Sequence, residues 1–308
     1  MSFTSKIKSE ITKQKFNKLE QISLLSGIIR NEVIEDTIRI QNENEEVANM
    51  IFNLIGQIYK IVPKITVRKG YNYNKNFIYI IELKQKVDEI KKDLSIETNI
   101  PNDYIIDDDN LTRSYLKGVF LAKGSINDPQ TSRYHLEIVV DNEEYANFIN
   151  DLINKYNLNS KILKRETKYM IYIKEAEKIG DFLRLIGTTK ALLYYEDIRI
   201  YRDHINMTNR LNNCEQANVD RIIQTAESQI KDIELIKKYG IELLSEKEQI
   251  VAEYRLKYKD ASLQELSEII SLETEQNITK PGLHHRFDKI KKLAQKIREK
   301  ETENDWIF

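Results

Sequence analysis

The sequence predicts an α+β body built from two similar repeats, followed by an all-α domain. Three observations predict it: a duplicated helix start, alternating apolar segments after each copy, and a C-terminal region of short capped helices. The length of 308 residues suggests two or three domains, and 41% hydrophobic residues are enough for real cores. With only 9 Gly and 4 Pro, we expect few turns and long elements.

The duplication is clearest in two twelve-residue segments. Residues 44–55 read NEEVANMIFNLI, and residues 142–153 read NEEYANFINDLI. Each segment opens with an Asn that suits a helix cap and two acids that suit the first turn. Apolar residues follow at helical spacing. We therefore expect one helix in each copy.

Segments that alternate apolar and polar residues follow each of these helices, as in a strand hairpin. The expected hairpin strands cover residues 64–68 and 77–81 in the first copy and residues 161–165 and 169–173 in the second. An apolar helix with small residues precedes each copy, over residues 25–33 and 116–124. Each unit therefore reads helix, strands, helix, hairpin, helix. A loop insertion around residues 128–132 explains the unequal spacing of the two copies.

Charge is distributed unevenly along the chain. The formal net charge is −1, yet residues 280–300 hold eight Lys or Arg against Asp288 and Glu299, which gives a local charge of +6. A basic stripe on a near-neutral chain marks a candidate site for a polyanion. A solvated helix face remains the alternative.

Cysteine usage and hydropathy point to the cytoplasm. The single Cys214 excludes an internal disulfide and a CxxC metal site. No apolar run approaches the ~20 residues of a membrane span, and the N-terminus leads into a polar helix without a signal core. We expect a soluble, intracellular protein that does not contact a membrane. His284 and His285 lack further ligands at metal spacing, so we expect no metal or other cofactor, and His135 and His204 are expected to be structural.

From about residue 243 the pattern changes to short helices with capping signals. Capping boxes begin at Ser245 and at Ser262, and Thr279 is expected to cap a last helix with Pro281 in its first turn. The predicted buried face of the last helix contains Leu283, Phe287, Ile290, Ala294 and Ile297. This order is typical of a helix-turn-helix, whose last helix enters the major groove. A three-helix module that binds a protein is the alternative.

Two sets of residues are candidates for contact with DNA. In the C-terminal domain they are Ser262, Lys280, His284, His285, Arg286, Lys289 and Lys292. In the repeats, possible secondary contacts are Lys64, Arg68, Lys161, Lys164 and Arg165. A solvated sheet face explains the second set equally well.

Residues 116–124, LKGVFLAKG, resemble the LAGLIDADG helix of homing endonucleases. In that family two such helices pack closely at small residues, here Gly27 and Gly118, and an acid at the end of each helix binds the catalytic Mg²⁺. The first copy keeps Glu32 at this position, but the second has Lys123. We therefore expect an ion pair in place of a metal site, and no catalysis. A metal-dependent endonuclease that keeps the ancestral fold is the alternative.

Three motifs in order resemble the WhiA family. Residues 209–218, NRLNNCEQAN, resemble its linker signature, and residues 261–266, ASLQEL, resemble its entry to the helix-turn-helix. Residues 280–290, KPGLHHRFDKI, resemble its last motif, with Pro281 and His284 where the family has Ser and Asn. These two changes put the base contacts in doubt but not the module.

The resemblance implies roles in cell division and chromosome segregation and, in sporulating lineages, in transcription of developmental genes. It implies double-stranded DNA as the partner, together with protein partners in transcription or division. An adaptor of the division machinery with secondary DNA binding is a further alternative. The expected domains are residues 1–98 and 99–205 for the repeats, 206–242 for a helical linker and 243–308 for the helix-turn-helix.

Overall fold

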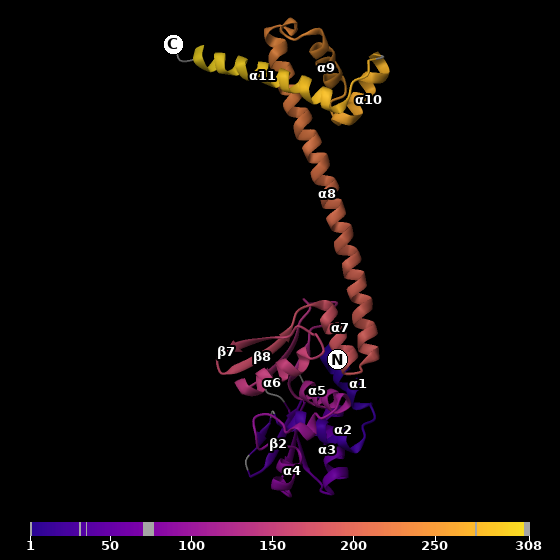
Figure 1. Ribbon diagram of the computed structural model, residues 1–308, viewed down its shortest axis with the longest axis vertical. Coiled ribbons are helices and arrows are strands. Elements are labelled where there is room, and N and C mark those ends of the chain that lie inside the picture. The colour runs from indigo at the N-terminus through magenta and orange to yellow at the C-terminus, as the bar shows by residue number, and fades with distance from the viewer. Residues whose placement is uncertain (1, 31, 35, 70–76, 275, 305–308) are drawn as a thin grey trace. The chain divides into compact units, whose positions relative to one another are not determined.

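The computed structural model describes residues 2–30, 32–34, 36–69, 77–274 and 276–304. The chain divides into two compact units, Met1–Asp203 and His204–Phe308, and helix α8 (Thr189–Tyr239) contributes residues to both (Figure 1). None of the described helices is long and apolar enough to cross a membrane.

The first unit contains the two predicted repeats. The first repeat runs α2 (Lys18–Ile29), β1 (Val33–Ile34), β2 (Ile38–Asn42), α3 (Glu45–Tyr59), β3 (Lys64–Lys69), β4 (Phe77–Leu83) and α4 (Val87–Asp93). After the short η1 (Asp103–Ile105), the second repeat runs α5 (Asp109–Lys123), β5 (Gly124–Ile126), β6 (Leu136–Val140), α6 (Glu143–Asn154), β7 (Lys161–Arg165), β8 (Lys168–Ile173) and α7 (Ala176–Leu185). The predicted α+β class and the order of elements in each repeat are confirmed.

The helix expected over residues 25–33 is wrong at its C-terminal end. Helix α2 ends at Ile29, and Val33 pairs with Arg39 in an antiparallel strand. Val and Ile are residue types that favour strands over helices, which explains why residues 33–34 join the sheet. Glu32 therefore follows the helix.

Each repeat folds its strands into a four-stranded antiparallel sheet. The strand orders are β1-β2-β4-β3 and β5-β6-β8-β7, so each predicted hairpin forms one side of its sheet. Alternate side chains face opposite sides of a strand, and one side of each sheet packs into the core through residues such as Ile40 and Ile138. We call the other side, which includes Lys64 in the first sheet and Lys161 in the second, the polar face.

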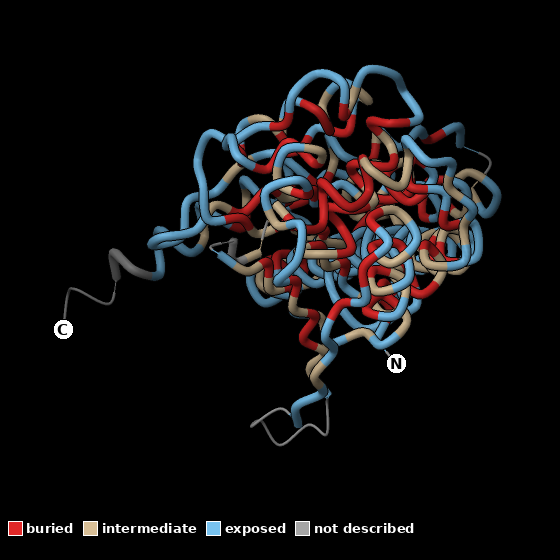
Figure 2. The backbone as a smooth tube through the Cα atoms, turned by 90° about the horizontal axis from the view of Figure 1, so that it is seen from below, coloured by how far each residue is buried: buried red, intermediate tan, exposed pale blue. Residues whose placement is uncertain are grey.

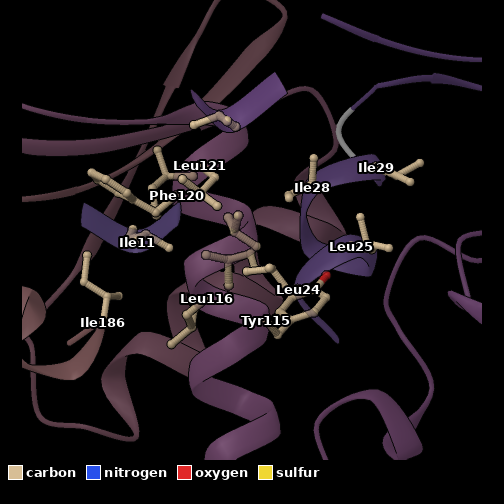
Figure 3. Close-up of a cluster of buried hydrophobic side chains, with 14 of the residues drawn as sticks. Ile11, Leu24, Leu25, Ile28, Ile29, Tyr115, Leu116, Phe120, Leu121 and Ile186 are labelled. Carbon is tan, nitrogen blue, oxygen red and sulfur yellow. The ribbon is translucent and has the colours of Figure 1, made fainter. Parts of the chain in front are cut away.

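Helices α2 and α5 pack at the predicted pair of glycines. A Cβ atom on Gly118 would lie 2.1 Å from the carbonyl oxygen of Leu24, and one on Gly27 would lie 2.4 Å from that of Tyr115. Both distances are far shorter than any van der Waals contact, so the backbones touch only because neither residue has a side chain. Around this contact, side chains of α2 and α5 form a buried cluster (Figure 3), and Figure 2 shows the buried residues in red.

Helix α1 (Phe3–Thr12), predicted only as a polar helix, has a buried apolar side. Ile11 packs beside Phe120 of α5 (Figure 3). The carboxylate of Glu10 accepts hydrogen bonds from the backbone N–H groups of Lys190 (2.8 Å) and Ala191 (3.0 Å). Because these N–H groups lie in the first turn of α8, Glu10 satisfies donors that the helix itself leaves free. The chain's first helix therefore holds the start of α8.

The second unit is helical. After α8 come η2 (Ile241–Leu243), α9 (Glu246–Lys257), α10 (Leu263–Thr274) and α11 (Lys280–Asn304). Its core joins residues of α9, α10 and α11 to Ile233 and Ile236 of α8. The domain boundaries expected at residues 205/206 and 242/243 stay predictions; α8 runs through the first without a break.

Substituting Gly118 by Ala tests the close approach of α2 and α5. The added methyl group would force two backbones apart, and overpacking of this kind typically costs about 1–3 kcal/mol. We expect Gly118→Ala to lower the urea midpoint of unfolding, followed by far-ultraviolet circular dichroism. The matched control is Gly56→Ala in α3, where the new Cβ would meet its nearest neighbour at an ordinary 3.5 Å. Equal midpoints for the two variants would contradict the packing argument.

Candidate nucleic-acid interface

The start of α10 and the start of α11 are both fixed by capping side chains. Ser262 Oγ accepts a hydrogen bond from the backbone N–H of Glu265 (3.2 Å), and the Glu265 carboxylate accepts one from the N–H of Ser262 (2.7 Å). Hydrogen bonds from the backbone N–H and the side chain of Ser262 to the Glu265 carboxylate lower its pKa, because they favour the charged form. Thr279 Oγ1 accepts a bond from the N–H of Gly282 (3.3 Å). The predicted caps are confirmed.

The connection between α10 and α11 is longer than a tight turn, and one serine bridges it. Ser271 Oγ accepts a hydrogen bond from the backbone N–H of Ile278 (3.0 Å) and donates one to its carbonyl oxygen (3.1 Å). Ile278 is itself buried in the core of the unit. These two bonds hold Ile278 against the last turn of α10 and so fix the point from which α11 begins.

Helix α11 separates a buried side from an exposed basic side, as its spacing predicts. Leu283, Phe287, Ile290 and Ala294 are buried, and Ile297 is half-buried. His285, Lys289 and Lys292 are exposed, and Lys280 is exposed at the first position of the helix. His285, Lys289 and Lys292 therefore lie on the side of α11 that faces away from the core, whereas Lys280 is exposed at the helix start, with a helical phase near the buried side.

Three of the predicted contact residues already have partners within the unit. Lys289 Nζ lies 3.7 Å from Glu248 Oε1, and Arg286 Nη1 donates to the carbonyl oxygen of Lys247 (3.5 Å). His284 Nδ1 lies 3.3 Å from Asp288 Oδ2 in the next turn of α11. Arg286 is half-buried against the start of α9, so it is the least accessible of the set.

The residues predicted in the repeats do not all share one face. Lys64 and Arg68 lie on the polar face of the first sheet, and Lys161 and Arg165 lie on that of the second. Lys164 lies on the opposite side, where its Nζ is 5.3 Å from the centre of the Tyr169 ring. The period of two in a strand separates Lys164 from its neighbours, which the sequence reasoning overlooked.

Sequence reasoning also missed Arg255 in α9. Its side chain is buried, and its Nη1 donates to the carbonyl oxygens of Ala261 (2.6 Å) and Tyr258 (3.3 Å). Its guanidinium lies 5.5 Å from the ring centre of Phe287 in α11. Burial lowers the pKa of Arg255. The residue links the loop before α10 to the buried side of α11. Its spacing of four from the buried Val251 is the sequence pattern that could have predicted its burial.

An ion pair joins the end of α5 to the segment that follows α2. Lys123 Nζ lies 3.3 Å from Glu32 Oε1, and the Glu32 side chain is only 7% exposed. Burial raises the pKa of Glu32, and the charge of Lys123 opposes this shift. Within the described residues, no three His, Cys, Asp or Glu side chains are grouped so that they could hold a metal. The predicted ion pair is confirmed.

Comparison with known proteins decides the family. Three family models match in order: the WhiA N-terminal LAGLIDADG-like domain over residues 20–97, the WhiA LAGLIDADG-like domain over 112–205, and the WhiA C-terminal HTH domain over 208–294. The chain belongs to the WhiA family. Proteins named probable cell division protein WhiA from Staphylococcus aureus strains JH9 and Newman are each 42% identical over 310 residues, covering 97% of this chain and 98% of theirs.

A solved structure agrees with this assignment. The crystal structure of full-length WhiA from Thermatoga maritima matches with a TM-score of 0.58 at 29% identity, covering 96% of this chain and 99% of that one. The predicted WhiA resemblance, with its LAGLIDADG-like repeats and helix-turn-helix, is therefore confirmed. The HTH model begins at residue 208, so the WhiA module includes the second half of α8.

Substituting Lys123 by Met tests the buried ion pair. Without Lys123 the pKa of Glu32 rises further, so the folded state holds the proton to a higher pH than the unfolded chain does. The stability that Lys123→Met loses should be small below the ordinary Glu pKa. It should grow as the pH rises from there toward the raised pKa of Glu32 in the folded variant. At neutral pH we expect Lys123→Met to lower the free energy of unfolding by about 1–3 kcal/mol. This is less than for a fully buried pair, because 33% of the Lys123 side chain is exposed.

The double variant Glu32→Gln with Lys123→Met is the matched control, because it removes both charges. We expect it to recover most of the stability at neutral pH. Urea unfolding at several pH values measures both variants. A deficit of Lys123→Met that does not change with pH would show that the pairing with Glu32 is not its cause.

Proposed function

We propose that this chain is a non-catalytic, double-stranded-DNA-binding protein that acts in cell division, as a transcription regulator and in chromosome segregation. The observation that carries the proposal is the exposed basic side of α11 within a capped helix-turn-helix. The family supports the division role, since its curated relatives are named probable cell division proteins. Such a protein would work in the cytoplasm, on the nucleoid.

Helix α11 has the dimensions and chemistry for the major groove. His285 and Lys292 lie two turns apart on the exposed side, which is about 10 Å along the helix axis. The major groove is ~12 Å wide and admits one helix, and Lys side chains pair well with the acceptor edge of guanine. Lys280, at the start of the helix, is better placed for a phosphate.

The repeats supply a scaffold in this proposal. Catalysis of DNA cleavage would need carboxylates at both former metal positions, and an ammonium group at Lys123 repels Mg²⁺. Lys64, Arg68, Lys161 and Arg165 are proposed as secondary phosphate contacts, and the remaining surface is available to protein partners in transcription or division.

Two substitutions in α11 separate phosphate contact from base reading. Lys280→Ala should weaken binding by the same factor on preferred and scrambled duplexes and reduce the salt slope by about one unit. His285→Ala should cost ~1–3 kcal/mol on the preferred duplex and much less on the scrambled one. Titrations at several salt concentrations measure both, with a preferred duplex taken from genome-wide binding.

The control for these variants is Lys300→Ala, which removes one exposed charge near the other end of α11. We expect it to leave affinity nearly unchanged on both duplexes. If Lys280→Ala and His285→Ala also left affinity unchanged but altered association with a protein, α11 would be a protein-binding helix and the proposal would be wrong.

We expect no Mg²⁺-dependent cleavage of DNA by the full chain. The reason is that the second of the two helix-end positions holds Lys123, whose ammonium group pairs with Glu32 and repels a cation. Conversion of supercoiled plasmid to nicked circles measures this directly. Efficient nicking that Glu32→Ala abolishes would establish a nuclease instead.

A further inference from the structure

A cavity of about 480 Å³ lies inside the second unit, where three helices meet. Its walls include Arg221, Gln224 and Ser228 of α8, Leu263 at the start of α10, and His284 and Lys291 of α11. The cavity therefore adjoins the helix that we propose reads DNA, although α8 lies outside the three helices of the helix-turn-helix itself.

The charges at the cavity leave two cations without an acidic partner. Asp232 is paired with Arg298 at 2.6 Å, and Asp288 is paired with His284. Arg221 and Lys291, by contrast, form no ion pair with any residue that the structure describes, and both are exposed. Asp232 and Asp288 also line the cavity, so the lining charges balance when His284 is neutral; with Arg298, which pairs with Asp232 from outside the lining, the local charge is 3 − 2 = +1. The two cations without an acidic partner lie on α8 and α11.

The start of α10 adds donors at the same place. The first backbone N–H groups of a helix have no partner within it, and the helix dipole favours an anion there. Ser262 Oγ accepts from the N–H of Glu265, so the N–H group of Leu263, the α10 residue that lines the cavity, has no capping side chain among the described residues. Arg221, Lys291 and this donor together suit a phosphate better than any of them alone.

The position of Lys291 on α11 relates the cavity to the DNA-binding side. Successive residues of a helix point about 100° apart, so Lys291 lies on the flank of the side that presents Lys292. When a helix occupies the major groove, the phosphate backbone runs along its flanks. A cation on the flank of α11 can therefore contact a phosphate, whereas one in the middle of the exposed side can contact a base.

We propose that this cavity binds a phosphate of the DNA backbone, held by Arg221 of α8 and Lys291 of α11. The inference rests on the proposed function and extends it, because it makes α8 part of the DNA-binding surface. Contact from two helices on one phosphate also fixes how α11 is rotated in the groove. Binding of a phosphate in this cavity, which we call the phosphate seat, does not depend on the DNA sequence.

The test uses the full chain with Arg221→Gln and a matched control, Arg210→Gln. Arg210 lies eleven residues earlier on α8, which is three turns, so it projects from nearly the same side and is equally exposed. Arg210 does not line the cavity. Preferred and scrambled duplexes are titrated at several salt concentrations, and the thermal midpoint of each variant checks folding.

We expect Arg221→Gln to weaken binding to both duplexes by the same factor, on the order of tenfold, and to reduce the salt slope by about one unit. Lys291→Gln should do the same. Since both residues hold one phosphate, the double variant should lose less than the product of the two single losses. Arg210→Gln should leave affinity and slope unchanged.

Three results would overturn the inference. Equal losses in Arg221→Gln and Arg210→Gln would indicate a diffuse charge effect along α8. Unchanged binding in Arg221→Gln, with His285→Ala still weakened, would reject the phosphate seat, leave the proposed function intact and point to an acidic protein segment as the occupant. If the unmodified chain bound no duplex at any salt concentration, the proposed function itself would fail, and the seat with it.

Discussion

The close approach of α2 and α5 is the constraint on which the first unit depends. At Gly27 and Gly118 the two backbones touch, which requires that both positions lack a side chain. Because each repeat begins with one of these helices, this single contact joins the two repeats into one core. Buried apolar side chains such as Leu24 and Tyr115 lie beside the contact and exclude water from it (Figure 3).

The same contact brings Glu32 and Lys123 together, because they follow and end the two helices. A carboxylate that is 7% exposed needs a partner, and Lys123 supplies the charge that a metal would supply in a LAGLIDADG endonuclease. The backbone N–H of Gln41 donates a further bond to Glu32 at 3.3 Å. The structure therefore holds an internal ion pair where the resemblance to LAGLIDADG endonucleases implies a metal-binding acid.

Features with a local physical cause were predictable from sequence, and features with a tertiary cause were not. The capping boxes, the hairpins and the buried side of α11 depend on residues a few positions apart, so their spacing predicts them. The burial of Arg255 depends on Phe287 and on carbonyl oxygens beyond the end of its own helix. Similarly, the role of Glu10 requires knowing that the start of α8 lies beside α1, some 180 residues later.

Helix α8 forms part of the core of the helix-turn-helix unit. Ile233 and Ile236 are fully buried among residues of the helix-turn-helix, and Asp232 is held by Arg298 of α11. The buried side of α11 is therefore completed by a helix that the expected domain boundaries placed in a linker. A substitution in this part of α8 would alter the support of α11 as directly as one in α9 would. The helix-turn-helix unit is in this sense a four-helix structure, and the position of α11 is set by contacts with α9 on one flank and with α8 on the other.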